Sequence, residues 1–386
     1  MNSSAELAAQ SKLPDVKTTI FTVMSQLAAR HGALNLSQGF PDFACPARLR
    51  ELVSEAMSAG HNQYAPMPGI PLLRQRIAEK VQSMYGAEVD PDTEITVTAG
   101  ATEALFVAIQ ALVRPGDEVI VFDPAYDSYE PAVHLAGGRC IHLPLAAPDY
   151  RLDFDRLEQA LGEHTRLVVI NSPHNPTGAV LSAADLARLE TVLASSRAFL
   201  LSDEVYEHIV FDGQLHQSAL GSPQLRERSL VVSSFGKTYH TTGWKVGYCI
   251  APPALTAEFR KIHQYVTFSI STPMQHAIAA FMEDPSFHLE LPRFYQAKRD
   301  HFRRALEGSK WSLLPCRGTY FQLLGYGNID QRPDVEMAEW LTREVGVAAI
   351  PISVFHADRQ DQHILRFCFA KDDATLDAAA ERLNRL

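Results

Sequence analysis

The stretch LVVINSPHNPTGAVLSAADLARLETVLASSRAFLLSDEVY, residues 167–206, decides the fold of this 386-residue chain. It begins with an apolar β-rich run at 167–171, continues through a helical pattern at 182–194, and returns to an apolar run at 198–203. A parallel pair of strands needs a long crossover connection, and a helix between two strands provides one. Two strands joined by a helix are therefore expected to lie parallel in one sheet. The stretch therefore predicts a strand–helix–strand unit of a parallel α/β sheet.

The same alternation continues on both sides of this stretch. Four further runs carry the strand pattern, at 94–98, 118–123, 229–234 and 246–251. Another helical pattern lies between the first two, at 103–113. Near-continuous apolar strands that alternate with helices are typical of an open, mostly parallel sheet with both faces covered. We predict this architecture for a large domain, residues 41–274.

The pattern of elements changes downstream of the large domain. Three helical patterns and two strand-like runs follow there, with helices at 286–308, 335–344 and 373–386 and strands at 320–324 and 364–369. This order, with polar turns between the elements, predicts a smaller α+β domain. We assign residues 1–40 and 275–386 to it, so the predicted fold is α/β, a large sheet domain with a smaller α+β domain.

Composition and charge exclude several classes of function. The chain is 46% hydrophobic with a net charge of −10, and it has no Lys/Arg run of the kind that binds nucleic acid. No apolar stretch reaches the roughly 18 residues that a spanning helix needs, and the beginning of the chain lacks the pattern of a secretory signal. The five cysteines show no CxxC spacing and the fifteen histidines no HExxH. We predict a cytoplasmic protein that binds no metal, no membrane and no nucleic acid.

Polar residues gather directly after five of the predicted strands. These segments are 100–102, 123–126, 171–178, 203–206 and 234–237. In an open α/β sheet, ligands bind beyond the carboxyl ends of the strands. Taken alone, Lys237 would be a surface lysine and Asp203 a helix N-cap, because those are the commoner roles of such residues. Five such segments at one edge of the sheet predict a ligand site instead.

The segment SSFGKTYHTTGWKVGY, residues 233–248, resembles the lysine signature of the class I/II pyridoxal-phosphate-dependent aminotransferases. Other landmarks of that family follow its order along the chain: NQYAPMPGIPLLRQRIA (62–78), TAGATEAL (98–105), DPAYDSYEP (123–131), NSPHNPTG (171–178), SDEVYEHIVF (202–211) and HILRFCFAK (363–371). The resemblance runs from about residue 20 to the end of the chain. It implies the type I fold of pyridoxal-phosphate enzymes, pyridoxal 5'-phosphate as cofactor, and a homodimer with shared active sites.

The resemblance assigns roles around the cofactor ring. Lys237 would bind the cofactor aldehyde as a Schiff base and then move the proton at the substrate Cα, which requires a neutral amine that burial and nearby cations favour. Asp203 would keep the pyridine nitrogen protonated, because a cationic ring is the effective electron sink. Tyr206, which we place three residues along the same face of a helix, and Asn175 would hold the phenolic oxygen. Tyr126 would stack on the ring.

The resemblance also implies a phosphate site. Gly100, Ala101 and Thr102 would open a helix whose N–H groups and dipole bind the anion. Ser234 would add a hydroxyl and Lys245 a cation, and Tyr64 would reach the phosphate of the neighbouring subunit. Many members of the family have an arginine where this chain has Lys245, so the chain departs from the common pattern there. The kynurenine and glutamine aminotransferase branch also carries this lysine.

A third set of residues would bind the amino acid. Arg366 would hold the α-carboxylate through two parallel hydrogen bonds, with Asn175 beside it and Gly39 beneath it. The segment 266–275 lacks the second arginine that a dicarboxylate would need, and has Phe268 and Ile270 instead. Aromatic residues also fall in segments that would line the side-chain pocket: Phe21, Phe40, Tyr126 and Phe355. The resemblance is closest to bacterial methionine aminotransferases, so we predict methionine as the preferred donor, with phenylalanine and histidine as further donors.

Two other functions remain open on the sequence. A kynurenine/glutamine-type aminotransferase with C–S β-lyase activity on cysteine conjugates would use the same scaffold, and pyruvate release without an oxo-acid acceptor would identify it. A regulator that only senses pyridoxal phosphate would resemble this chain in fold, but it would add a DNA-binding domain before the family's landmarks. The acidic charge disfavours that second alternative.

Overall fold

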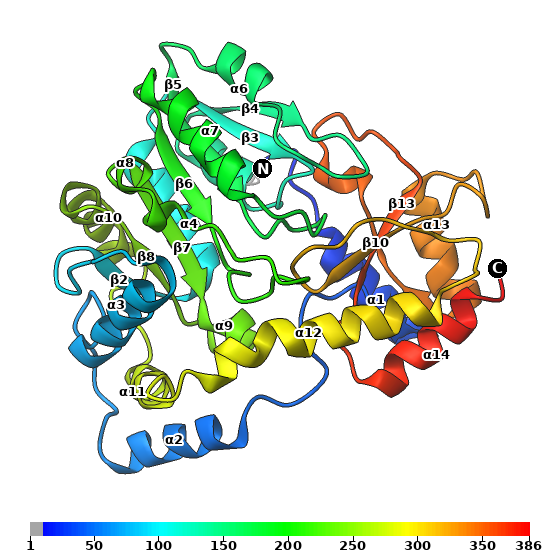
Figure 1. Cartoon of the computed structure of the whole chain (residues 1–386), viewed down its shortest axis with the longest axis horizontal. Coiled ribbons are helices and arrows are strands. Elements are labelled where there is room, and N and C mark those ends of the chain that lie inside the picture. The colour runs from blue at the N-terminus through cyan, green and yellow to red at the C-terminus, as the bar shows by residue number, and fades with distance from the viewer. Residues whose placement is uncertain (1–10) are drawn as a thin grey trace, which may run out of the picture.

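The structure, a computed structural model, describes residues 11–386. Its largest feature is a seven-stranded sheet in the order β2-β8-β7-β6-β5-β3-β4 (Figure 1). These strands are β2 Ile95–Thr98, β3 Glu118–Asp123, β4 Arg139–Pro144, β5 Thr165–Asn171, β6 Phe199–Asp203, β7 Ser229–Ser234 and β8 Gly247–Ile250. All neighbours from β7 to β4 pair in parallel, whereas β8 is antiparallel to both β7 and β2. The predicted α/β class with a mostly parallel sheet is confirmed.

Helices cover both faces of this sheet because the strands are apolar on both sides. Val119 and Val121 of β3 belong to one core cluster together with residues of α4 and α10, whereas Ile120 and Phe122 belong to another together with residues of α3 and α7. The helices of this part are α2 Ala47–Ser58, α3 Pro71–Tyr85, α4 Gly100–Leu112, α5 Tyr129–Leu135, α6 Phe154–Ala160, α7 Ala183–Ala194, α8 Pro223–Arg226, α9 Phe235–Thr238, α10 Pro253–Val266 and α11 Thr272–Phe281. Continuous apolar runs therefore become strands that are buried on both faces.

A second, antiparallel sheet in the order β12-β13-β10-β9 lies on the other side of the molecule (Figure 1). Its strands are β9 Ser312–Leu313, β10 Phe321–Gly325, β12 Ile350–Pro351 and β13 Ile364–Cys368. The helices of this part are α1 Ile20–His31, α12 Ser286–Ala305, α13 Asp334–Trp340 and α14 Asp373–Leu383. The short strand β1 (Leu34–Asn35) pairs with β11 (Val347–Ala348), which joins the N-terminal segment to this part of the fold.

The division into residues 41–274 and residues 1–40 with 275–386 stays a prediction. The boundary at 275 falls inside α11, which packs on α2 and α3. The long helix α12, yellow in Figure 1, then runs from the side of the large sheet to the second sheet. No helix within residues 11–386 has both the length and the apolar character to cross a membrane.

The structure corrects two local predictions and adds one strand to the large sheet. The helix that we placed after β6 is a hydrogen-bonded turn at 205–208, closed by the N–H of Glu207 on the carbonyl of Glu204 and by the N–H of Ile209 on that of Tyr206. The helix predicted at 335–344 ends at Trp340 and continues as one π-helical turn. The edge strand β4 was not predicted, because its residues are only partly buried and lack a continuous apolar run.

Candidate active site

A cavity of about 410 Å³ lies at the ends of β2, β3, β5, β6 and β7. Because β8 is antiparallel to both of its neighbours, β2 points the same way as the parallel strands, and all five carboxyl ends meet at one edge. The predicted site residues on its wall are Gly39, Phe40, Gly100, Ala101, Thr102, Tyr126, Asn175, Asp203, Tyr206, Ser234, Lys237 and Lys245. A larger cavity of about 490 Å³ adjoins it at Asn171, and none of the predicted site residues line it.

Lys237 lies on the short helix α9, directly after β7. Its Nζ donates to the carbonyl of Gly39 at 3.1 Å and lies 5.6 Å from the ring centroids of both Tyr206 and Tyr320. Burial lowers the pKa of Lys237 to about 8, and the positive charges of Arg366 and Lys245 act in the same direction. About a tenth of the amine is therefore neutral at pH 7, far more than for an ordinary lysine, and the neutral form is what a nucleophile requires.

Asp203 is the last residue of β6 and is buried. Its Oδ2 accepts a hydrogen bond from the Tyr129 hydroxyl at 2.7 Å, and its Oδ1 accepts one from the N–H of Val205 at 3.3 Å. Burial raises the pKa of Asp203 to about 6. A cation opposite this carboxylate would lower that pKa again, so the site favours a positively charged partner. Tyr129 was not predicted, although it stands in the DPAYDSYEP segment.

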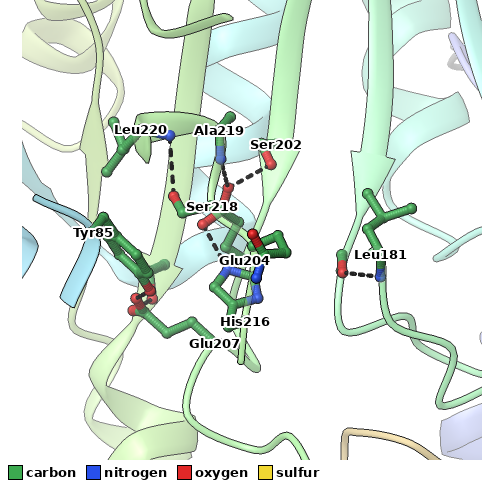
Figure 2. Close-up of polar contacts among 12 residues, drawn as sticks. Tyr85, Leu181, Ser202, Glu204, Glu207, His216, Ser218, Ala219 and Leu220 are labelled. Atoms are coloured by element: carbon green, nitrogen blue, oxygen red, sulfur yellow. Dashed lines mark hydrogen bonds and ion pairs between the residues drawn. The ribbon is translucent and has the colours of Figure 1, made fainter. Parts of the chain in front are cut away.

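The end of β6 and the turn after it, which carry Asp203 and Tyr206, are anchored by two buried glutamates that do not line the cavity (Figure 2). Glu204 accepts hydrogen bonds from Ser202 Oγ at 2.7 Å, from the N–H of Ala219 at 3.0 Å and from His216 Nε2 at 2.9 Å. These contacts tie the residue next to Asp203 to a neighbouring loop. Sequence motifs gave no indication of this anchoring role.

Glu207 is the second anchor, next to Tyr206. It forms an ion pair with Lys80 Nζ at 2.6 Å and accepts hydrogen bonds from Tyr85 at 2.6 Å, Ser233 at 2.5 Å and Tyr248 at 2.9 Å. Burial alone would raise the pKa of Glu207, but Lys80, His208 and the hydrogen bond from Ser233 outweigh it and hold the pKa well below its usual range. These contacts therefore tie the turn to α3, β7 and β8.

The residues that we predicted for the phosphate lie together where α4 begins. Gly100 is the first residue of α4 and has a φ of +75°, which favours glycine. A Cβ built on Gly100 would lie 3.4 Å from Lys245 Nζ, so this amine packs against the helix N-terminus. Ala101, Thr102 and Ser234 complete the wall. Free N–H groups, the helix dipole and a cation together attract a phosphate.

Arg366 lies on β13 and is 1% exposed. Its Nη1 donates to Asn175 Oδ1 at 2.8 Å, and its Nη2 donates to the carbonyl of Ser37 at 3.0 Å. Its Nε has no partner, and within residues 11–386 no carboxylate forms an ion pair with the guanidinium. A buried cation that lacks an anionic partner is costly, so this position favours a carboxylate ligand.

Gly39 joins the two sides of the cavity. Its carbonyl accepts hydrogen bonds from Lys237 and, at 2.5 Å, from the Tyr320 hydroxyl. A Cβ on Gly39 would lie 2.9 Å from the ring of Phe321, and the guanidinium of Arg366 lies 3.9 Å from the centroid of that ring. The glycine therefore gives room to Phe321, which in turn supports Arg366. Tyr320 was not predicted as a site residue.

The predicted residues Arg366, Phe21 and Tyr64 do not line the cavity itself, and Arg366 contacts its wall through Asn175. Phe21 of α1 lies behind Arg366, with its ring centroid 5.3 Å from the guanidinium and 5.9 Å from the ring of Phe355. Tyr64 is 83% exposed and packs edge-on against Phe268 at 5.3 Å. Tyr64 therefore lies on the surface of the chain rather than in its own cavity.

Comparisons with known proteins agree with this geometry. The family model for aminotransferase class I and II matches residues 32–383. The methionine aminotransferase of Escherichia coli (strain K12) is 55% identical over 98% of this chain and 99% of its own length. The human kynurenine–oxoglutarate transaminase 1 is 33% identical over 93% of this chain and 94% of its own length.

Solved structures give the same result. A structure from E. coli, in which a methionine aminotransferase function was identified, has a TM-score of 0.97 at 55% identity and covers 98% of this chain and 100% of its own. The N-succinyldiaminopimelate aminotransferase of Mycobacterium tuberculosis has a TM-score of 0.94 at 39% identity, with 98% and 100% covered. The chain belongs to the class I and II aminotransferase family.

Proposed function

We propose that this chain is a pyridoxal-phosphate-dependent aminotransferase that takes the α-amino group of methionine and passes it to a 2-oxo acid. The observation that carries the proposal is that a lysine of lowered pKa and a buried aspartate line one cavity, while a buried arginine without an anionic partner bonds to Asn175 on the wall of that cavity. These are the groups that amino transfer from a free amino acid requires.

The residues present fit pyridoxal phosphate. Gly100, Ala101, Thr102, Ser234 and Lys245 form an anion site of the kind that suits its phosphate. When bound, the cofactor supplies an electron-accepting ring that stabilises negative charge at the substrate Cα.

A second group of residues would hold the ring of the cofactor. Asp203 would face the pyridine nitrogen, and Tyr206 with Asn175 would hold the phenolic oxygen. Tyr126 would pack on the ring, and Lys237 would reach the aldehyde. All five side chains line the same cavity.

Each of the chain's own side chains then has a separate role in the reaction. Asp203, ionised when a cation faces it, keeps the ring nitrogen protonated. Lys237, as a neutral amine, would take the proton from the substrate Cα and deliver it to the carbon of the cofactor's aldehyde group. Arg366 binds the substrate carboxylate through the guanidinium N–H groups that do not bond to Asn175 or Ser37. Asn175 helps to orient that carboxylate.

The wall of the cavity favours an uncharged substrate side chain. Among the described residues that line it, Lys237 and Lys245 are the cations, and both have other roles in this proposal. A distal carboxylate therefore lacks a partner, whereas Phe40 and Tyr126 offer apolar surface. The 55% identity with a methionine aminotransferase supports the same preference. We also propose a cytoplasmic homodimer in which the exposed Tyr64 reaches the phosphate of the neighbouring site.

A steady-state donor panel tests this proposal. We expect methionine to give the highest kcat/KM, with phenylalanine, histidine and kynurenine behind it and aspartate last. Pyruvate release from a cysteine conjugate without an oxo-acid acceptor measures any lyase reaction in the same samples. A ranking with aspartate above methionine would contradict the donor preference, and no transfer from any amino acid would contradict the whole proposal.

A further inference from the structure

Strand β3 ends in an aspartate whose carboxylate bonds to the part of the fold that carries the second sheet. Asp123, the last residue of β3, accepts a hydrogen bond through Oδ2 from the N–H of Ala357 at 2.8 Å. Two residues further along, the N–H of Ala125 donates to the carbonyl of Phe355 at 2.8 Å. These two bonds fasten the Phe355 turn, residues 353–357, to the end of β3.

The Phe355 turn is also anchored at its other end. The N–H and hydroxyl of Ser353 donate to the carboxylate of Asp334 on α13, at 2.8 and 2.6 Å. Phe355 is buried, and its ring centroid lies 5.9 Å from that of Phe21 and 5.6 Å from the guanidinium of Arg366. The turn therefore packs directly behind the arginine that binds the substrate carboxylate in the proposed function.

Asp123 itself is held by β4 and α5. His142 Nδ1 lies 2.8 Å from Asp123 Oδ1, and His142 Nε2 lies 3.6 Å from Glu130. The hydrogen bond to Asp123, together with the nearby carboxylate of Glu130, raises the pKa of His142 to about 9, so the imidazole is charged at neutral pH. Both oxygens of the buried carboxylate are thus engaged, one toward His142 and one toward the Phe355 turn.

We infer that Asp123 is a positioning residue for substrate binding. Together with His142 it holds the Phe355 turn, and through this turn Arg366, at a fixed place relative to the cavity residues that bind the cofactor. The inference rests on the proposed function of Arg366. Parts of a chain that pack through a modest interface shift against each other by default, so a direct bond next to the site limits that shift. A carboxylate that accepts a backbone N–H makes a stronger bond than two neutral groups do.

The same two strands offer a matched control. Glu118, the first residue of β3, pairs with Arg139, the first residue of β4, just as Asp123 pairs with His142 near the other end. Asp123→Ala and Glu118→Ala therefore remove the same kind of pair from opposite ends of β3. His142→Gln is a milder variant that keeps Asp123 in place.

The test measures the binding of two small molecules to the holoenzyme at neutral pH. The first is methionine, as the concentration dependence of the half-reaction followed by cofactor absorbance. The second is 4-(methylsulfanyl)butanoate, which is methionine without its amino group, followed by calorimetry. Asp123→Ala should weaken both by about tenfold, as expected for the loss of one hydrogen bond to a charged group. The limiting rate and the Kd of the cofactor should stay within about twofold, because the cofactor side of the cavity is unchanged.

The controls decide the outcome. His142→Gln should weaken both ligands in the same direction and by less, and Glu118→Ala should weaken neither. Unchanged binding in Asp123→Ala, or equal weakening in Glu118→Ala, would overturn the inference, and so would a parallel loss of cofactor affinity. If Asp123→Ala does not fold, His142→Gln alone gives the answer. A wild-type enzyme that binds 4-(methylsulfanyl)butanoate but does not convert methionine would contradict the proposed function and leave this inference to the calorimetric comparison.

Discussion

The two sides of the cavity are built in different ways. On the sheet side, Asp203 and Lys237 follow directly on the strands that carry them, and short motifs fix their places. On the side of the second sheet, which we call the clamp side, Arg366 of β13 bonds to the carbonyl of Ser37, which lies 329 residues away in the sequence. The Tyr320 hydroxyl bonds there to the carbonyl of Gly39, 281 residues away. The sheet side is local in sequence, whereas the clamp side exists only in the folded chain.

This difference separates two properties of the enzyme. In the proposed function, the residues for the chemical step lie at the carboxyl edge of a sheet that is buried on both faces. The substrate carboxylate would be held by a residue of the other sheet, which bonds to Asn175 and the N-terminal segment. Variants of the sheet side should therefore remove catalysis or folding, and variants of the clamp side should weaken substrate binding.

Lys237→Ala should have the largest effect, because it removes the only neutral amine of the proposed mechanism. We expect a loss of visible absorbance from the bound cofactor and a fall in kcat of about a thousandfold or more. Lys261→Ala on α10, where an exposed lysine pairs with Glu258, is the control and should behave as wild type. An unchanged absorption spectrum in Lys237→Ala would remove that lysine from its role.

Glu207→Gln should have the next largest effect, on stability. It leaves the Lys80 ammonium buried without its carboxylate, which should lower the free energy of unfolding by about 3–5 kcal/mol. The double variant Glu207→Gln with Lys80→Met should recover most of that loss, because no unpaired charge remains. Denaturant titration of the three proteins measures both. A double variant no more stable than the single one would mean that the ion pair is not what anchors the turn.

Arg366→Gln should lower kcat/KM for methionine on the order of a hundredfold, or about 3 kcal/mol, because a charge-assisted bond to the substrate carboxylate is lost. The Kd of the cofactor should not change, in contrast to variants of the sheet side. Steady-state kinetics and a cofactor titration distinguish the two. A matching loss of cofactor affinity would show that the two sides do not separate as described.

The smallest effect should appear in the pH dependence of stability. Asp123 and Glu130 face His142 and raise its pKa to about 9, and Glu130 in turn lies 3.8 Å from His134 Nε2 and is influenced by the charge of Arg359. A raised pKa stabilises the fold fully below the ordinary pKa of histidine, near 6.5, and that contribution disappears as the pH rises through 9. The Tm advantage of wild type over His142→Gln, about 2–4 °C at pH 6, should therefore shrink toward zero above pH 9. A gap that is constant with pH would contradict this.

Most of the fold could be predicted because its strands are continuous apolar runs between helical patterns. The run at 198–203 became β6 almost unchanged, and the glycine at residue 100 opens α4 as expected. The turn after β6 was wrongly predicted as a helix because a spacing of three residues puts Asp203 and Tyr206 on one face in either structure. Local sequence could not separate the two.

The rest of the site could not be predicted for a physical reason. Tyr129 and Tyr320 are buried aromatic residues, and nothing in their sequence context distinguishes a hydrogen-bonding phenol from a core side chain. The bond from Ala357 to Asp123 joins positions 234 residues apart through a backbone N–H, which leaves no residue pattern at all. Contacts of this kind become visible only in the structure.

One measurement tests the central claim most directly, namely that the cavity at Lys237 takes the amino group of methionine. Holoenzyme is mixed with one donor and no acceptor, and the cofactor absorbance is followed together with the oxo acid formed. Methionine should convert the cofactor fully and release one equivalent of its oxo acid, whereas aspartate at the same concentration should leave the spectrum largely unchanged. Conversion by aspartate without conversion by methionine would contradict the account.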